Sequence, residues 1–299
     1  RLMSRLRLPA KLGLLAGVLL VPLMLMTAHV ISSARQELAV LAGDQQGARL
    51  VRDALELSAA IDDHRTLTHR AQSGEPALGP ALQTARVRLG ASLNALDAAI
   101  SAAPAFQLTE PWQAVRARID MLVRDKVPGG RAAALSFHGE QVEQVRRLTL
   151  LAAERSGLLL DSSPAVHFLV DLSVNTMIPW VDRLGQATAA GGGLLMRGDA
   201  TRSEKTEMRA LAAAGQRQLD TVASKAAALI RAGVALPSSW DSARVSAEQF
   251  INQTERIFGA EALVGEPEPN LRAGNQASSS AIRFGQDSLD LLDERLITA

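Results

Sequence analysis

The chain contains no cysteine and no tyrosine, and aromatic residues make up only 3% of its 299 positions. Without cysteine it forms no disulfide, attaches no haem through thioethers and offers no thiolate to a metal ion. With so few aromatic rings, the core must be built from Leu, Ala, Val and Ile, which pack well in the seams of helical bundles. The composition therefore favours an all-helical fold.

A net charge of either sign is also lacking, because 32 basic residues are balanced by 31 acidic ones. A formal net charge of +1 gives the chain no overall field that would attract nucleic acid. We therefore expect no nucleic-acid partner. The hydrophobic content of 47% is ample for a buried core, so disorder is not expected.

The sequence motifs of common enzymes and metal sites are absent. There is no Gly-rich phosphate loop, no GxSxG elbow, no HExxH and no acidic calcium loop. Of the five histidines only His64 and His69 lie close in sequence, and on a helix their directions differ by about 140°. Two ligands so oriented do not easily share one metal ion. We expect no enzyme, no catalytic residues, no metal and no cofactor.

One long apolar run, LGLLAGVLLVPLMLMTAHVI at 12–31, is the strongest single feature. Its twenty residues are about the length that a helix needs to cross roughly 30 Å of hydrocarbon. Four basic residues precede it, which places the N-terminus in the cytoplasm by the positive-inside rule: Arg1, Arg5, Arg7 and Lys11. We predict a cytoplasmic tail over 1–11, a transmembrane helix over 12–31 and a periplasmic helical region over 32–299, in the bacterial inner membrane. A cleaved signal peptide is the alternative.

The outer region is divided into helices by Gly and Pro, and its apolar residues recur three and four positions apart, as in Leu50, Ala54, Leu57 and Ile61. No alternating strand pattern occurs. The fold class predicted is all-α, with the transmembrane helix continuing into an elongated antiparallel bundle of one or two stacked four-helix modules. The helices are expected near 33–72, 80–102, 109–126, 132–159, 164–189, 202–232, 238–259 and 267–296.

Polar residues interrupt the first apolar stripe and form a candidate ligand site. Extending the stripe from Ile61 by three places His64 on the core line. Arg65 lies beside it and Thr68 follows one turn on. A cation at a bundle seam either pairs internally or lines a pocket for an anion such as a carboxylate or nitrate. Both interpretations stay open at this point.

A second candidate site surrounds Pro179, which interrupts an otherwise continuous helical pattern. Proline removes the hydrogen bond to the carbonyl of Asn175 and is expected to bend the helix there. The bend would free polar backbone next to Trp180, so Asn175, Trp180 and Arg183 form a possible pocket. The alternative is that Pro179 marks a helix end and Trp180 packs in the core.

Two segments resemble bacterial methyl-accepting chemotaxis proteins with helical sensor regions. GARLVRDALELSAAIDDHRTLTHR at 47–70 is similar to an element of nitrate/nitrite-type sensors, with Thr66 where that family has Gly. The segment 161–200, in which a helix begins at Pro164 with PAVHFLVDLSVNTMIPWVDRLGQATAA, resembles the middle of such regions. The resemblance implies a homodimer of helical bundles that binds a small molecule, with an anion as one option.

On this resemblance we expect the ligand-sensing region of a transmembrane chemoreceptor, which passes binding across the inner membrane by helix displacement. The family's cytoplasmic signalling module is missing from this chain. Two alternatives remain: the sensor of a diguanylate cyclase or histidine kinase, and a membrane-tethered helical protein with a structural or interaction role.

Overall fold

The computed structural model describes the chain except for residues 1–7, 76, 161–162 and 299, and except for the side chains of 8–16 and 18. The described part contains α-helices, short 3-10 turns and no strand, which confirms the all-α class. The α-helices are α1 (Leu8–Gln72), α2 (Gly79–Ala102), α3 (Thr109–Val123), α4 (Arg131–Ser156), α5 (Pro164–Asn175), α6 (Met177–Arg197), α7 (Arg202–Arg231), α8 (Ser239–Gly259) and α9 (Pro267–Thr298). Packing divides the chain into two units, 1–43 and 44–299.

The described residues of the first unit belong to α1, and they do not support a membrane span. Within the described part of the chain, no helix combines the length and the apolar character that crossing a bilayer requires. Pro22, Thr27 and His29 interrupt the described part of the run. The transmembrane helix predicted over 12–31 and the inner-membrane location are therefore wrong. The predicted tail residues Arg1, Arg5 and Arg7 lie outside the described residues, as does the side chain of Lys11.

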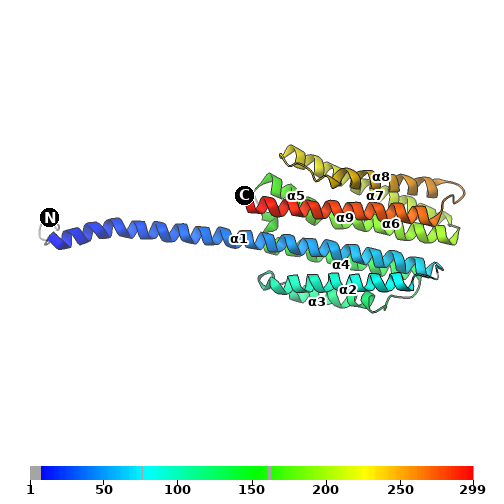
Figure 1. Ribbon diagram of the computed structural model, residues 1–299, viewed down its shortest axis with the longest axis horizontal. Coiled ribbons are helices and arrows are strands. Elements are labelled where there is room, and N and C mark those ends of the chain that lie inside the picture. The colour runs from blue at the N-terminus through cyan, green and yellow to red at the C-terminus, as the bar shows by residue number, and fades with distance from the viewer. Residues whose placement is uncertain (1–7, 76, 161–162, 299) are drawn as a thin grey trace. The chain divides into compact units, whose positions relative to one another are not determined.

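In the second unit the helices form two groups that lie side by side (Figure 1). One group consists of α6, α7, α8 and α9, in which α9 packs against α6 and α8 and α7 packs against the same two helices. The other group consists of α1 from residue 44 onward with α2, α3 and α4. Ion pairs from α1 to α9 and to α6 join the groups.

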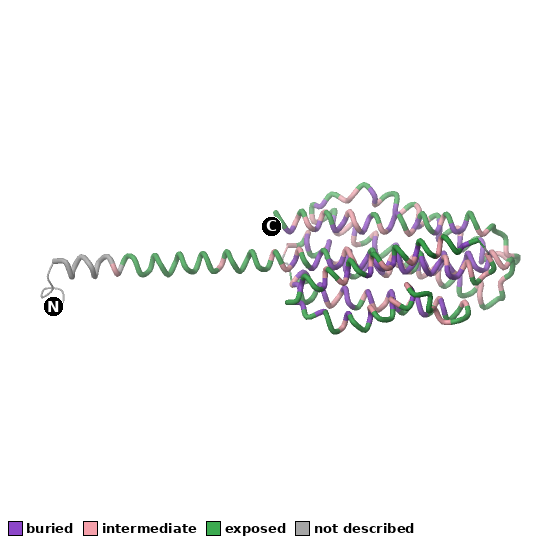
Figure 2. The backbone as a smooth tube through the Cα atoms, turned by 60° about the horizontal axis from the view of Figure 1, so that its bottom comes forward, coloured by how far each residue is buried: buried purple, intermediate pink, exposed green. Residues whose placement is uncertain are grey.

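Apolar seams form the core of both groups, as the sequence pattern predicts. Leu50, Ala54, Leu57 and Ile61 of α1 are each 2% exposed or less. Figure 2 shows the same arrangement throughout the bundle, with buried positions on the inward faces of the helices and exposed positions on the outer faces. At roughly 25 cal/mol per Å² of apolar area removed from water, such seams supply the main driving force for the fold.

The helix predicted over 164–189 is broken in two. It ends as α5 at Asn175, and α6 begins at Met177 after a single residue, Thr176. Pro179 has no N–H to donate to the Asn175 carbonyl, and the helical pattern resumes when the Trp180 N–H donates to Thr176 at 3.1 Å. α6 then continues to Arg197, eight residues beyond the predicted end. Its glycines at 191–193 are helical and lie where an added Cβ would meet side chains of neighbouring helices, among them α1, α7, α8 and α9.

We expect Gly274→Ala to destabilise the second unit. A Cβ on Gly274 of α9 would lie 2.7 Å from Cγ2 and 2.9 Å from Cβ of Thr188 on α6. Thr188 is 1% exposed and its hydroxyl donates to the Leu184 carbonyl at 2.7 Å, so it cannot move aside. Overpacking of this kind lowers the unfolding free energy by about 1–3 kcal/mol.

The matched control is Gly139→Ala in α4, where the nearest atom lies 4.0 Å from the added Cβ. Alanine there should leave stability unchanged or raise it by up to about 1 kcal/mol, because alanine favours helix over glycine. Urea unfolding followed by circular dichroism gives both values. Equal midpoints for the two variants would contradict the close packing of α6 on α9.

Candidate functional site

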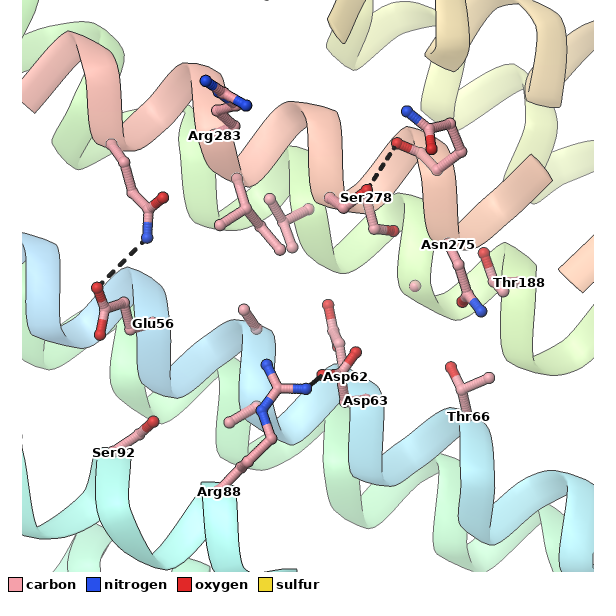
Figure 3. A pocket seen from close by; sticks show the side chains of 18 of the residues that line it. Glu56, Asp62, Asp63, Thr66, Arg88, Ser92, Thr188, Asn275, Ser278 and Arg283 are labelled. Carbon is pink, nitrogen blue, oxygen red and sulfur yellow. Dashed lines mark hydrogen bonds and ion pairs between the residues drawn. The ribbon is translucent and has the colours of Figure 1, made fainter. Parts of the chain in front are cut away.

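A polar groove of about 1080 Å³ lies between the two helix groups, and we call it the interbundle groove (Figure 3). Helix α1 forms one wall, α9 forms the opposite wall, and α2 and α6 contribute the remaining surface. Its polar lining includes Glu56, Asp62, Asp63, Thr66, Arg88, Ser92, Thr188, Arg272, Asn275, Gln276, Ser278, Ser279, Arg283, Gln286 and Asp287. Charged, amide and hydroxyl side chains thus line the groove together with a few apolar residues such as Ala60, Val181 and Ile282.

Helix α9 faces the groove with one stripe of its surface. Arg272, Gln276, Ser279 and Arg283 follow one another at spacings of three and four, which puts them on one side of a helix. The groove is bounded at one end by a close approach, where Gly285 of α9 meets Leu55 of α1. Beyond that contact the two helices leave room for a ligand.

A buried cluster of two carboxylates and one guanidinium lies beneath the groove. Arg65 of α1 donates from Nη1 to Oδ1 of Asp182 at 2.8 Å and from Nη2 to the Asp182 carbonyl at 3.1 Å. The same guanidinium forms an ion pair with Asp62, one turn earlier on α1. Gln186 donates to the second oxygen of Asp182 at 2.7 Å. We call Asp62, Arg65 and Asp182 the buried ionic cluster.

With both acids ionised, the cluster holds one more negative charge than positive charge, and this imbalance affects the ionisation of Asp62. Burial raises the pKa of Asp62 well above its ordinary value, against the opposing attraction of Arg65. Outside its ion pair with Arg65, the Asp62 carboxylate accepts no hydrogen bond within the described part of the chain. Asp62 therefore either holds a proton or needs a second cationic partner.

Gly185 of α6 makes this cluster possible. A Cβ at that position would lie 2.7 Å from Oδ2 of Asp62 and 2.7 Å from Nη2 of Arg65. The absence of a side chain lets α6 approach α1 closely enough for Asp182 to reach the guanidinium. Gly185 also lines the groove, so the cluster and the groove share one wall.

The remaining charges of the groove are less buried. Arg88 of α2 pairs with Asp63 at 2.9 Å, and Figure 3 shows this pair beside Asp62. Both side chains are at least half exposed, so the pair adds little stability. Arg272 and Arg283 of α9 are exposed and form no ion pair with any described residue. The α9 wall therefore offers cations that lack a counter-charge.

The first predicted site is divided by the structure. Arg65 joins the buried ionic cluster, whereas His64 contacts His138 of α4. His138 Nδ1 donates to the Ala134 carbonyl at 2.6 Å, which leaves Nε2 to accept from Nδ1 of His64 at 2.9 Å. Thr68 Oγ1 lies 3.4 Å from the same Nδ1. His64, Arg65 and Thr68 are buried behind the groove rather than on its surface.

The second predicted site is not brought together. Asn175 is exposed and donates to Asp171 at 2.8 Å, one turn earlier on α5. Trp180 is fully buried, with its ring 6.5 Å from that of Trp240 and its Nε1 without a hydrogen-bond partner among the described residues. Arg183 is exposed and donates to Gln186 at 3.0 Å. Ligand binding by these residues stays a prediction.

Sequence reasoning missed the residues that line the groove. Asp62, Asp63 and Thr66 lie within the segment that held the first predicted site. Arg272, Asn275 and Arg283 follow a polar stripe on α9, but a polar stripe on one helix looks the same whether it faces solvent or a groove. Only the pairing of α9 with α1 distinguishes the two, and no local sequence feature encodes that pairing.

Comparison with known proteins identifies a similar fold without assigning a family. No protein-family model matches the chain, and no curated protein matches it. Among solved structures, "Structure of the NasR transcription antiterminator" is similar to this chain with a TM-score of 0.57 and 18% sequence identity. The alignment covers 91% of this chain and 74% of that one. At this identity the likeness shows the fold alone.

This likeness corrects the expectations that were drawn from the chemoreceptor resemblance. The chemotaxis family assignment is wrong, because no such family matches and the similar fold occurs in a transcription antiterminator. The function of a transmembrane chemoreceptor in the inner membrane is wrong for the same reason, together with the absence of a membrane-spanning helix from the described residues. The apolar spacing typical of helical sensors occurs in helical bundles in general, so it could not distinguish a chemoreceptor sensor region from another helical bundle.

The expected partners are also wrong as a set. The homodimer and the small-molecule ligand, possibly anionic, followed from the chemoreceptor resemblance, and the membrane followed from the apolar run at 12–31; neither basis is supported. The exclusion of nucleic acid rested on the net charge of +1, yet a similar fold occurs in a protein that acts on transcription. Net charge describes the whole chain and does not report how charge is distributed on one face.

We expect Asp182→Ala to destabilise the fold strongly. It would remove the hydrogen bond from Arg65 to the Asp182 carboxylate and leave Asp62 as the one remaining ionic partner of the guanidinium in the cluster, and loss of a hydrogen bond to a charged group lowers the unfolding free energy by about 1.5–3 kcal/mol. The control is Glu248→Ala, which breaks a partly exposed pair with Arg244 on α8 and should lower it by roughly 0.3–0.5 kcal/mol. Similar losses in chemical unfolding would show that Asp182 does not hold the guanidinium.

We expect stability to fall as the pH drops from 6.5 towards 4. Burial lowers the pKa of His64 and His69 to about 4 and that of His138 to about 3. The unfolded chain takes up protons near the ordinary value of 6.5, whereas the folded chain does not. The contribution of the neutral histidines to the free energy of unfolding is complete above pH 6.5. Below that pH it decreases by about 1.4 kcal/mol per pH unit for each histidine.

His138→Gln tests this expectation, because its amide can donate to Ala134 and accept from His64 without titrating. The variant should lose the share of the pH slope that belongs to one histidine. Asp62, whose raised pKa acts in the opposite sense, is common to both proteins and cancels in the difference. An unchanged slope in unfolding measurements between pH 6.5 and 4 would contradict a neutral, buried His138.

Proposed function

We propose that residues 44–298 form a regulatory module of a protein that controls transcription, in which the two helix groups shift against each other when the interbundle groove is occupied. The observation that carries the proposal is the groove itself, which lies between residues 56–66 of α1 and residues 272–287 of α9. The proposal keeps the sequence-based expectation that the chain is not an enzyme.

The contacts around the groove support a shift of this kind. At one end, α1 and α9 are held together by Arg52, which pairs with Asp290 at 2.8 Å, and by the approach of Leu55 to Gly285. Further along, polar side chains replace apolar contacts between these helices. Small displacements of packed helices, of about 1–2 Å, are a common form of regulatory transition. A ligand in the groove would act on α1 and α9 at once.

The process that the module controls is suggested by the fold that the chain shares with the NasR transcription antiterminator. That protein's name assigns it to the control of transcript termination, and the likeness extends over 91% of the present chain. The groove and the shared fold are independent arguments. The groove supports a shift of the helices on ligand binding, and the shared fold supports transcription as the process that the module controls.

Mapping of transcript ends in the source cells tests this function. Cells carrying Asp62→Asn, or Arg272→Gln together with Arg283→Gln, should show altered read-through at a defined set of terminators, because these changes remove charge from the groove. Arg209→Gln, at an exposed position on α7, is the control and should leave the ends unchanged. Transcript ends that are identical in all four strains, with normal protein levels, would refute the proposal.

A further inference from the structure

The interbundle groove presents charges of opposite sign on its two walls. On the α1 wall, Asp62 is 5% exposed and accepts no hydrogen bond from any described residue outside its ion pair with Arg65. With both of its acids ionised, the buried ionic cluster to which Asp62 belongs carries one excess negative charge. Because buried Asp62 either holds a proton or needs a second cationic partner, a cationic group at this wall would stabilise its ionised form.

On the α9 wall the excess charge is positive. Arg272 and Arg283 are exposed groove residues and form no ion pair within the described part of the chain. Asn275 and Ser279 lie between them in sequence and also line the groove, so hydrogen-bonding groups accompany the two guanidinium groups. A guanidinium binds a carboxylate through two parallel hydrogen bonds, which makes this wall suited to an anionic group.

The register of the two helices sets the spacing of these charges. Arg52 pairs with Asp290, and Gln286 donates to Glu56 at 3.3 Å, so α1 and α9 run antiparallel with residue numbers that add to the same value. Continuing this register brings Asp62 level with residue 280. Arg283 is three residues further along α9, an axial offset of about 4.5 Å. Asp62 and Arg283 thus lie nearly level along the two helices, on opposite walls of the groove.

We propose that the interbundle groove binds a free amino acid, with the ligand's ammonium group at Asp62 and its carboxylate at Arg283. This inference deepens the proposed function and rests on it for the consequence of binding. The ammonium supplies the second cation that the buried ionic cluster lacks. Arg88 is paired with Asp63, whereas Arg283 forms no ion pair with any described residue.

Binding of simpler ions is disfavoured by the same arrangement. An inorganic anion such as nitrate would pair with an arginine of α9 and leave Asp62 as it is. A simple amine would neutralise Asp62 and leave the guanidinium groups in water. A molecule that carries both charges satisfies both walls, and its affinity should depend on both groups together.

The experiment titrates the full chain with each of the twenty protein amino acids, and follows the thermal midpoint and the heat of binding. For every amino acid that binds, the amine without its carboxylate, the acid without its amine, and sodium nitrate are titrated in parallel. We expect at least one amino acid to raise the midpoint and neither half-molecule to do so. If no amino acid binds, or if nitrate or a half-molecule binds as tightly, the inference is overturned.

Two substitutions assign the charges. Asp62→Asn removes the excess negative charge with little change of shape, and Arg283→Gln removes the cation. Each should weaken amino-acid binding roughly tenfold to a hundredfold, the range expected for a hydrogen-bonded charge. Arg209→Gln on α7 should leave the affinity unchanged. Circular dichroism confirms folding, and unaltered affinity in folded Asp62→Asn would place the ligand elsewhere.

The outcome is separable from that of the proposed function. Amino acids that bind with unchanged transcript ends in the groove variants would refute the regulatory role and leave this inference standing. Altered transcript ends without any amino-acid binding would refute this inference and leave the regulatory role standing.

Discussion

The buried guanidinium of Arg65 is the interaction on which the relation between the two helix groups depends. A charged group that water does not reach must find its counter-charges in the protein, and here they come from Asp62 on its own helix and Asp182 on α6. The pair with Asp182 fixes α1 against α6, and the pair with Asp62 orients a carboxylate beside the groove. Because two acids share one cation, the guanidinium is paired with both, and Asp62 either holds a proton or needs a second cationic partner. The pairing requirement of Arg65 thus explains why a buried acid lies beside the groove.

Small residues allow this polar interior to exist inside a bundle that is otherwise apolar. Gly185 lets the backbone of α6 approach the guanidinium, and Gly274 lets α9 pack on Thr188 nearby. At Gly285, by contrast, the neighbours are the apolar side chains of Leu55 and Met177. Along one pair of helices the contact therefore changes from close apolar packing to an open polar groove. Such a change along a single seam is consistent with one end that stays fixed while the other responds.

The sequence predicted the helical elements well because Pro and Gly punctuation and apolar spacing are local features. Prediction from the sequence failed where the structure depends on contacts between residues far apart in the chain. The helix predicted to end near 189 continues through the glycines at 191–193, beside which side chains from other helices pack. The apolar stripe through Ile61 placed His64 on the core line with Arg65 beside it and left two interpretations of Arg65 open, and in the structure Arg65 is paired internally. Its partner Asp182 lies 117 positions away, so no local pattern could name it. The membrane span was inferred from one apolar run that Pro22, Thr27 and His29 interrupt in its described part.

The groove shows why a shared fold does not settle a shared ligand. Apolar seams tolerate exchange among Leu, Ala, Val and Ile, so two bundles can retain one architecture at 18% identity. The groove residues are not required by those seams, since Arg272 and Arg283 are exposed and contribute little to the core. They are free to differ between proteins of one fold, and the ligand must be inferred from the charges of each groove. In the described part of this chain those charges are the buried Asp62 on α1 and the arginines Arg272 and Arg283 on α9, which form no ion pair. A ligand with a charge of one sign would pair with only one of the two walls.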